Sequence, residues 1–458
     1  MKSFTTIAAV GALAASVSAT PAQGPQKRAT ITPITIKGSA FFQGDKRFYI
    51  RGVDYQPGGS SAAEDPIADV AGCKRDVAKF KELGLNTIRV YTVDNSANHD
   101  ECMTELANAG IYLALDVNSP NYSINREKPA RSYNKMYLQS VFATIDAFAK
   151  YDNTLLFFSG NEVINDDKTT QCAPYIKAVD RDMRSYINAR KYRKIPVGYS
   201  AADVEENRVQ MAQYMNCGPD GARSDFYAFN DYAWCDPDTS STDWEKKAET
   251  FSNYSIPLFL SEYGCNENKR EFNAVKGLYG DKMTKAYSGG LVYEYTEEGS
   301  KYGLVKLDGD NVKTLDDFDA LKKAFKNTPI PTTDGNYNQQ GSPSKCPTKG
   351  DHWNVDMKDD VLPSMPQGVD EFFKNGAGAG KGLKGGSQEA GSDKTVTGPA
   401  ASGAITTGAT NSGSAGAASS PSASAGAASS LRSSDFSATP FVTGFVVLVS
   451  SVLGAALL

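Results

Sequence analysis

The sequence predicts an α/β protein built on a (β/α)8 (TIM) barrel, and two observations carry this prediction. Short apolar runs rich in β-branched and aromatic residues recur through residues 30–375, and amphipathic helical stretches separate them. The runs show little polar alternation, as is typical of parallel strands buried on both faces. Eight strand–helix units in succession is the number that closes such a barrel.

The strands can be assigned in chain order. They are FYIRGVDY, NTIRVYTV, IYLALDV, TLLFFSG, KIPVGYS, DFYAFNDY, IPLFLSE and GGLVYEY. The helical stretches are 76–84, 102–110, 134–151, 172–190, 242–254, 271–280 and 315–327. A doubly wound open sheet is the competing fold, but no glycine-rich phosphate turn follows the first strand, so the barrel is favoured.

Both ends of the chain carry processing signals. Residues 1–19 combine a lysine, an apolar stretch and small residues up to Ala19, which predicts a cleaved signal peptide. Residues 441–458 are apolar and uncharged, and a polar spacer separates them from the small residues at 426–430. This order predicts a glycosylphosphatidylinositol (GPI) anchor attached near Gly426, with 427–458 removed. A transmembrane helix is the alternative, but eighteen residues are at the short limit and no basic residue follows.

A change in composition marks the segment before this signal. From about residue 376 the chain consists largely of Gly, Ala, Ser and Thr. Such a segment buries too little apolar surface to offset its ordering entropy, so we predict a disordered, O-glycosylated stalk over 376–426. We expect the mature protein to be a monomer on the outer face of the plasma membrane, or in the cell wall.

Composition excludes several classes of function. A net charge of −5 and scattered basic residues do not indicate a basic surface that would bind nucleic acid. The two histidines, His99 and His352, have no His or Cys at metal-ligand spacing. A zinc site or a Ser-His-Asp hydrolase is therefore not expected, and no metal or cofactor is predicted. Carboxylates must carry any acid–base chemistry.

Two glutamates stand at the ends of apolar strands. The run LLFFSGNEVIND places Glu162 after the fourth strand, and IPLFLSEYG ends the seventh on Glu262. The carboxyl ends of barrel strands form the active face, so both side chains can point into one cleft. Paired carboxylates about 5–5.5 Å apart serve retaining glycoside cleavage, and pairs about 6.5–9.5 Å apart serve inversion. The alternative is that each glutamate is a polar strand end without a catalytic task.

Other residues at strand ends fit the same chemistry. Asn161 could hold a sugar hydroxyl, and either Arg89 or Tyr263 could keep the second glutamate ionised. Aromatic rings at a barrel mouth suit the apolar faces of sugars. The candidates are Tyr91, Tyr232, Trp234, Tyr293 and Tyr295, the last two expected on one face because strand side chains alternate.

The chain resembles the fungal GPI-anchored β-1,3-glucanosyltransferases of glycoside hydrolase family 72. The resemblance rests on IRGVDYQPGG, CKRDV, NTIRVYTV, SINRE, FFSGNEV, PLFLSEYGCNE, SGGLVYEY, KYGLVKLDG and TLDDF. It implies a (β/α)8 catalytic domain over 20–330. It also implies retaining transglycosylation, in which an internal β-1,3-glucan bond is cut. The segment with the new reducing end is then passed to the non-reducing end of another glucan.

The resemblance also assigns roles to residues. Glu162 matches the acid/base and Glu262 the nucleophile. The donor-side positions are Tyr91, Asn161, Tyr293 and the loop of Ser123, Asn125, Arg126 and Glu127. Asp203 and Arg208 match the acceptor side, and Tyr232 and Tyr295 remain possible further contacts. The partners are thus donor and acceptor glucan chains. A plain endo-β-1,3-glucanase and a non-catalytic glucan-binding wall glycoprotein are the alternatives.

An exported chain should oxidise its cysteines. Six of the seven can pair, and sequence alone leaves the pairing open. The resemblance pairs Cys73 with Cys102, Cys217 with Cys346 and Cys235 with Cys265, and leaves Cys172 free. Cys346 would tie residues 331–375 to the barrel. No cysteine follows it, which places the chain in the branch without a cysteine-rich carbohydrate-binding module. Sequons at Asn121 and Asn253 are candidate glycosylation sites.

Overall fold

The computed structural model describes residues 31–238, 242–358 and 361–400. Contacts divide the chain into one unit up to Ala409 and a second from Thr410, and the second lies outside the described residues. The predicted signal peptide, the stalk beyond 400, Gly426 and the segment 427–458 also lie outside them.

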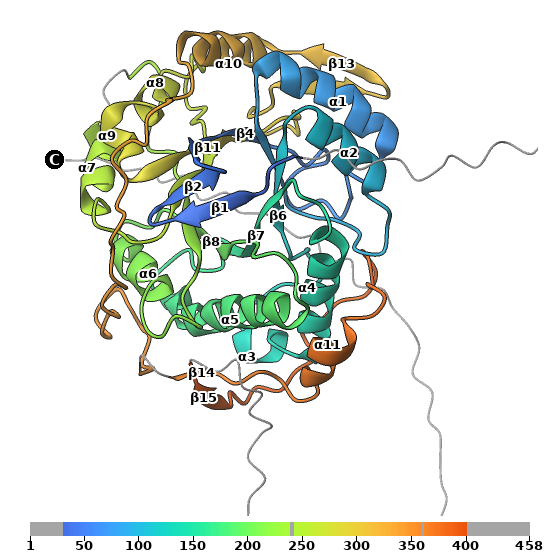
Figure 1. Ribbon diagram of the computed structural model, residues 1–458, viewed down its shortest axis with the longest axis vertical. Helices are drawn as coiled ribbons and strands as arrows, with labels where there is room; N and C mark the ends of the chain where they lie inside the picture. The colour runs from blue at the N-terminus through green and yellow to red at the C-terminus, as the bar shows by residue number, and fades with distance from the viewer. Residues whose placement is uncertain (1–30, 239–241, 359–360, 401–458) are drawn as a thin grey trace, which may run out of the picture. The chain divides into compact units, whose positions relative to one another are not determined.

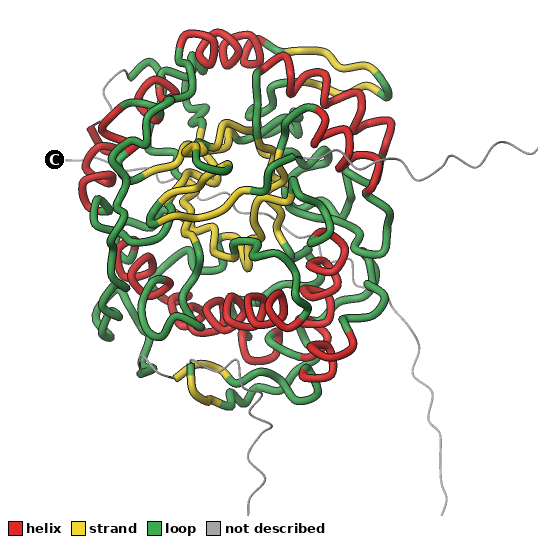
Figure 2. The backbone as a smooth tube through the Cα atoms, in the orientation of Figure 1, coloured by secondary structure: helices red, strands yellow, loops and turns green. Residues whose placement is uncertain are grey.

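Eight parallel strands close into a barrel, which confirms the predicted fold class (Figures 1 and 2). Neighbouring strands follow one another in the chain, and the last pairs with the first. The strands are β4 (Ile50–Asp54), β5 (Thr87–Val90), β6 (Tyr112–Asp116), β7 (Thr154–Asn161), β8 (Val197–Ala202), β9 (Phe226–Asn230), β10 (Leu258–Tyr263) and β11 (Tyr287–Val292).

A small antiparallel sheet, which the sequence pattern did not predict, precedes the barrel. It consists of β1 (Ile34–Lys37), β2 (Ala40–Gln43) and β3 (Lys46–Phe48). Figure 1 shows β1 and β2 lying across one end of the barrel. The Phe41 ring packs against Phe226 and Phe259, which lie near the amino ends of β9 and β10. This sheet closes the amino end of the barrel, so a site must form at the carboxyl end.

Helices surround the barrel (Figure 2). They include α1 (Val70–Leu83), α2 (Asp100–Asn108), α3 (Pro129–Ser132), α4 (Lys135–Phe148), η1 (Lys168–Cys172), α5 (Ala173–Ala189), α6 (Arg208–Met215), α7 (Thr242–Thr250), α8 (Ala274–Leu278), α9 (Asp281–Thr284) and α10 (Asp316–Asn327). Helix α6 belongs to the fifth strand–helix unit, after β8, and was not among the helices predicted from the sequence because its apolar residues do not gather on one face. The hairpin of β12 (Val305–Asp308) and β13 (Asn311–Thr314) precedes α10.

The three disulfides and the free thiol are those that the family resemblance implied. Cys73 is bonded to Cys102, Cys217 to Cys346 and Cys235 to Cys265, while Cys172 is free and buried. The Cys217–Cys346 bond spans 129 residues and ties the segment after α10 to the loop that follows α6. Such a long cross-link restricts the unfolded chain strongly.

The expectation of a disordered stalk from residue 376 was wrong for residues 376–400. After β14 (Val361–Pro363) and α11 (Asp370–Asn375), the chain runs along the body and returns as β15 (Thr397–Pro399), which pairs with β14. We call residues 376–396 the C-terminal arm. Its glycines allow the backbone to approach closely, because a Cβ on Gly380 would lie 2.1 Å from Asn95 Oδ1. The composition that suggested disorder is therefore compatible with tight packing.

Within the described ranges, no helix has both the length and the apolar character needed to cross a bilayer. The two sequons lie in this part of the chain, and both Asn121 and Asn253 are exposed at the surface.

Candidate active site

The carboxyl end of the barrel carries a polar side chain from nearly every strand. The strands themselves are buried, and a polar residue in the carboxyl-terminal half of each run lies at the barrel mouth. These residues are Asp54 on β4, Arg89 on β5, Asp116 on β6, Asn161 on β7, Ser200 on β8, Asn230 on β9 and Glu262 on β10.

Arg89 lies at the centre of this group with its side chain fully buried. Its guanidinium donates to both oxygens of Asp116, at 2.9 and 3.3 Å, and to Asn161 Oδ1 at 3.0 Å. It also donates to Glu262 Oε1 at 3.2 Å, and its Nη1 lies 3.9 Å from Asp54. Burial acts to lower the pKa of Arg89, but the surrounding charges raise it well above its ordinary value. One fixed positive charge thus stands among several acids.

Glu262 receives three hydrogen bonds on its carboxylate. Tyr91 Oη and Arg89 donate to Oε1, the first at 2.7 Å, and Tyr232 Oη donates to Oε2 at 2.7 Å. Burial and the nearby charge of Glu162 raise the pKa of Glu262 from 4.5 to about 7, against the lowering effect of Arg89 and the two tyrosines. The carboxylate is therefore both held in place and kept close to its protonation midpoint at neutral pH.

Glu162 follows β7 directly and adopts a positive φ of 47°. This backbone conformation is uncommon for a residue with a side chain and is often found at functional sites. Asn230 Nδ2 donates to Glu162 Oε1 at 2.9 Å, and Arg126 donates to the Glu162 carbonyl oxygen at 2.8 Å. Asn230 is also the register partner of Glu262 on β10, so one asparagine links the two glutamates.

Asn161 is fixed by a buried polar network. Its Oδ1 accepts from Arg89, from Ser200 Oγ at 2.7 Å and from Asn230 Nδ2 at 3.1 Å. Ser200 in turn contacts Ser261 Oγ at 2.9 Å. Because all these bonds are accepted by the side-chain oxygen Oδ1, the side-chain nitrogen Nδ2 of Asn161 remains as a donor that can face the cleft.

A cavity of about 270 Å³ adjoins this network. Its wall includes Tyr91, Asn161 and the loop residues Ser123 and Arg126, four of the donor-side residues expected from the sequence. Asn125 instead stabilises the loop, since its Oδ1 accepts from the backbone of Glu127 and Lys128, and Glu127 itself is exposed.

Three tyrosine rings form an aromatic cluster at the mouth. Tyr293 follows β11, and its ring centroid lies 6.3 Å from that of Tyr232 and 5.3 Å from that of Tyr302. The Tyr293 hydroxyl donates to Ser60 Oγ at 3.2 Å. All three rings remain partly exposed, so they can face a ligand.

Two sequence interpretations were wrong at this end of the barrel. Tyr295 is not on the ligand-facing side: it is fully buried, packs on Tyr55 and Phe80, and donates to Asp76 at 2.9 Å. Because β11 ends at Val292, strand alternation does not extend to residue 295. Tyr263 does not bond to Glu262, and its ring packs 5.9 Å from that of Trp244, so Arg89 alone of the two candidates contacts this carboxylate.

Asp203 directly follows β8, Arg208 is the first residue of α6, and the two side chains lie together. Arg208 donates to both oxygens of Asp203, and Lys247 Nζ contacts Asp203 at 2.6 Å and Asp231 at 2.5 Å. These side chains form a partly buried network of four charges. The sequence reading did not find Lys247 or Asp231.

Several further residues of the site escaped the sequence reading. Asp54, Asp116 and Asn230 end their strands as the two glutamates do, so the same signal would have found them. Asp54 is fully buried, and neither carboxylate oxygen has a hydrogen bond. Burial raises its pKa well above the ordinary value, which favours the uncharged acid. Tyr302 carries no such signal, because it follows the last barrel strand in an irregular segment.

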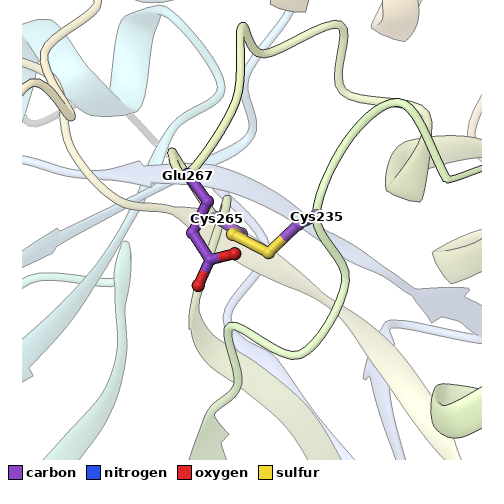
Figure 3. A group of neighbouring side chains, drawn as sticks. All are labelled: Cys235, Cys265 and Glu267. Carbon is purple, nitrogen blue, oxygen red and sulfur yellow. A yellow bond between two sulfur atoms is a disulfide. The ribbon is translucent and has the colours of Figure 1, made fainter. Parts of the chain in front are cut away.

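Cys235, Cys265 and Glu267 form a group with potential metal ligands, shown in Figure 3. The two sulfur atoms are bonded to each other and therefore cannot act as thiolate ligands. This group is a disulfide beside an exposed carboxylate.

The paired glutamates at the ends of β7 and β10 of a (β/α)8 barrel define a glycoside-processing enzyme. The family model described as glucanosyltransferase, glycoside hydrolase family 72, matches residues 24–329. The chain is 62% identical over 386 residues to 1,3-β-glucanosyltransferase gel1 of Aspergillus fumigatus, covering 84% of this chain and 85% of the relative. It is 50% identical to 1,3-β-glucanosyltransferase GAS5 of Saccharomyces cerevisiae, covering 80% and 77%.

Solved structures agree with these matches. A variant of Saccharomyces cerevisiae Gas2 in complex with laminaritetraose and laminaripentaose superposes with a TM-score of 0.68 at 37% identity. The match covers 74% of this chain and 75% of that one. The chain belongs to the glucanosyltransferase family, glycoside hydrolase family 72.

The raised pKa of Glu262 predicts a pH-dependent cost to stability. Between 4.5 and about 7 the native protein binds a proton that the unfolded chain has released, so stability falls as pH rises through this interval. Glu262→Gln cannot ionise, so its melting temperature should exceed that of wild type at pH 8, and the excess should shrink at pH 5. Glu127→Gln, at an exposed glutamate, controls for the loss of one charge. An excess independent of pH would contradict the prediction.

Proposed function

We propose that this protein is a retaining 1,3-β-glucanosyltransferase. The observation that carries the proposal is the Glu262 carboxylate, buried and held by Arg89, Tyr91 and Tyr232, with Glu162 beside it on a family 72 chain. The substrate class follows from the family and from relatives named as 1,3-β-glucanosyltransferases.

In the first step, Glu262 attacks the anomeric carbon at an internal β-1,3 bond. Glu162 gives its proton to the leaving oxygen as the glycosidic bond breaks, and an ester bond forms between C1 and Glu262. The segment on the enzyme retains its new reducing end as this ester, and the remaining chain departs.

In the second step, the ionised Glu162 removes a proton from the 3-hydroxyl at the non-reducing end of an acceptor glucan. The acceptor oxygen attacks C1, the ester breaks, and Glu262 leaves as a carboxylate. Two inversions at C1 restore the β configuration, and the acceptor chain is longer by the transferred segment.

The contacts divide the two glutamates between these roles. The first step needs an ionised Glu262 and a protonated Glu162. Arg89, Tyr91 and Tyr232 all stabilise negative charge on Glu262, whereas the carboxylate of Glu162 accepts from the neutral amide of Asn230. These three donors oppose the rise in the pKa of Glu262 that burial causes, and so favour Glu262 as the nucleophile.

The donor glucan would occupy the cavity beside Tyr91. The free amide nitrogen of Asn161 suits the sugar 2-hydroxyl, and Ser123 and Arg126 add polar groups along the wall. The rings of Tyr232 and Tyr293 offer stacking faces at the mouth. Asn125 and Glu127 act at most through the shape of their loop, since their described contacts are within it.

The acceptor would lie on the other side of the glutamate pair, near Asp203 and Arg208. Their mutual pairing, with Lys247 bracing Asp203, holds this loop in one conformation. A rigid loop suits an acceptor site, because binding must place a sugar hydroxyl more favourably than water at the ester.

The cellular placement completes the proposal. We infer secretion, N-glycosylation at Asn121 and Asn253, and a GPI anchor near Gly426 that holds a monomer on the outer face of the plasma membrane or passes it to the wall. Its support is the order of signals at both ends of the chain, together with the exposure of both sequons.

The decisive experiment is product sizing with a reduced laminari-oligosaccharide. We expect wild-type protein to give products longer than the substrate, and Glu162→Gln and Glu262→Gln to lower the rate by about 10²-fold or more while remaining folded. Shorter products alone would indicate an endo-glucanase instead. Substantial transfer by either folded variant would refute the assigned mechanism, and binding without any turnover in wild type would favour a glucan-binding wall protein.

The acceptor assignment gives a separate prediction. The double variant Asp203→Ala with Arg208→Ala should shift products from elongated to shortened glucans, because water then discharges the ester. Removing both partners avoids leaving either charge buried alone. The measurement is the ratio of transfer to hydrolysis at matched substrate conversion. A lower total rate with an unchanged ratio would place the acceptor site elsewhere.

A further inference from the structure

We propose that the C-terminal arm is a structural part of the donor site. Residues 384–393 of the arm hold the segment of residues 119–132, which ends in α3 and is here called the donor-side loop, in the position that shapes the donor cavity. The arm thus sets the affinity for the donor glucan, an assignment that rests on the proposed function.

The arm and the donor-side loop are joined first through their backbones. The amide of Ser387 donates to the Asn121 carbonyl oxygen at 3.0 Å, and the amide of Gly391 donates to that of Arg131 at 2.9 Å. A Cβ on Gly391 would lie 2.3 Å from the Arg131 oxygen, so only glycine allows this approach. The two bonds fix the arm at opposite ends of the loop.

Side chains add contacts between these two points. Gln388 Nε2 donates to Ser123 Oγ at 2.7 Å and to the Pro120 carbonyl oxygen at 3.2 Å. Tyr122 Oη donates to the Lys384 carbonyl oxygen at 2.8 Å. Asn134, just beyond the loop, donates to the Ser387 carbonyl oxygen at 2.7 Å.

Ion pairs close the outer edge of this interface. Arg131 contacts both Glu389, at 2.9 Å, and Asp393, and Lys128 contacts Glu389 at 3.2 Å. These groups are largely exposed, so their contribution is small. They nevertheless make the two surfaces complementary, with acidic residues on the arm and basic residues on the loop.

The held loop is the one that lines the donor cavity. Ser119, Pro120, Ser123, Ile124 and Arg126 all belong to the cavity wall, and Gln388 contacts two of them directly. Arg126 also donates to the carbonyl oxygen of Glu162. If the arm were detached, the loop residues of the cavity wall would become more mobile. Glu162 and Glu262 would keep their contacts to β9 and β5.

Gln388 acts here as a positioning residue, and the chain offers a matched control for it. Gln139 on α4 also donates two hydrogen bonds across to the arm, to the carbonyl oxygens of Ala377 and Ala379 at 3.0 and 3.1 Å. Those bonds hold the arm but do not touch the donor-side loop. Gln139→Ala thus also removes two glutamine hydrogen bonds that hold the arm, but it should leave the donor-side loop and the affinity for the donor unchanged.

The test compares the full-length wild type, Gln388→Ala with Gly391→Ala, and Gln139→Ala. The first readout is hydrogen exchange of residues 119–132 without substrate. The second is kcat and KM with reduced laminari-oligosaccharide as donor. In the double variant we expect faster exchange in the loop and a KM about threefold to tenfold higher with kcat unchanged, as follows from the loss of a few hydrogen bonds. Gln139→Ala should match wild type in both.

The outcomes separate the arm from the proposed function. Unchanged exchange in the double variant would overturn the proposal, as would faster exchange without a rise in KM. An equal fall of kcat in both variants would assign the arm to general stability and likewise overturn it. An inactive wild type would refute the proposed function, and the exchange data would still decide whether the arm holds the loop.

Discussion

The fully buried guanidinium of Arg89 is the interaction on which the site depends. It bonds to Asp116, Asn161 and Glu262 at once, so three strands besides its own are tied to one group. A buried charge is costly unless it is paired and fully hydrogen-bonded, and here the acids supply that pairing. The contact with Glu262 opposes the rise in its pKa that burial causes, and the contact with Asn161 orients that asparagine beside Glu162. One buried side chain therefore organises the polar end of the barrel.

The rest of the fold serves to keep this end of the barrel open and ordered. The antiparallel sheet around Phe41 closes the amino end, so the polar mouth lies at the carboxyl end. The Cys235–Cys265 bond joins the segments that follow β9 and β10, and the C-terminal arm packs on the donor-side loop. Covalent and hydrogen-bonded braces thus stabilise loops that no regular element supports.

The sequence alone predicted the eight barrel strands and both glutamates, because apolar runs that end in a polar residue are a strong local signal. It missed Asp54, Asp116 and Asn230 only because the same signal was not applied to every strand. The packed arm was not predictable in this way. Its order comes from backbone bonds such as Gly391 to Arg131, which composition does not encode. The burial of Tyr295 depends on where β11 ends, which the alternating pattern extended too far.

The pH dependence of kcat/KM tests the central role of Arg89 most directly. In wild type the acid limb should lie near pH 7, where Glu262 loses its proton. The variant Arg89→Met with Asp116→Asn removes this ion pair as a unit, so Asp116 is not left as an unpaired buried charge. The account predicts that its acid limb moves to higher pH, because Glu262 loses its positive neighbour. An acid limb at the wild-type position in a cooperatively folded variant would contradict the account.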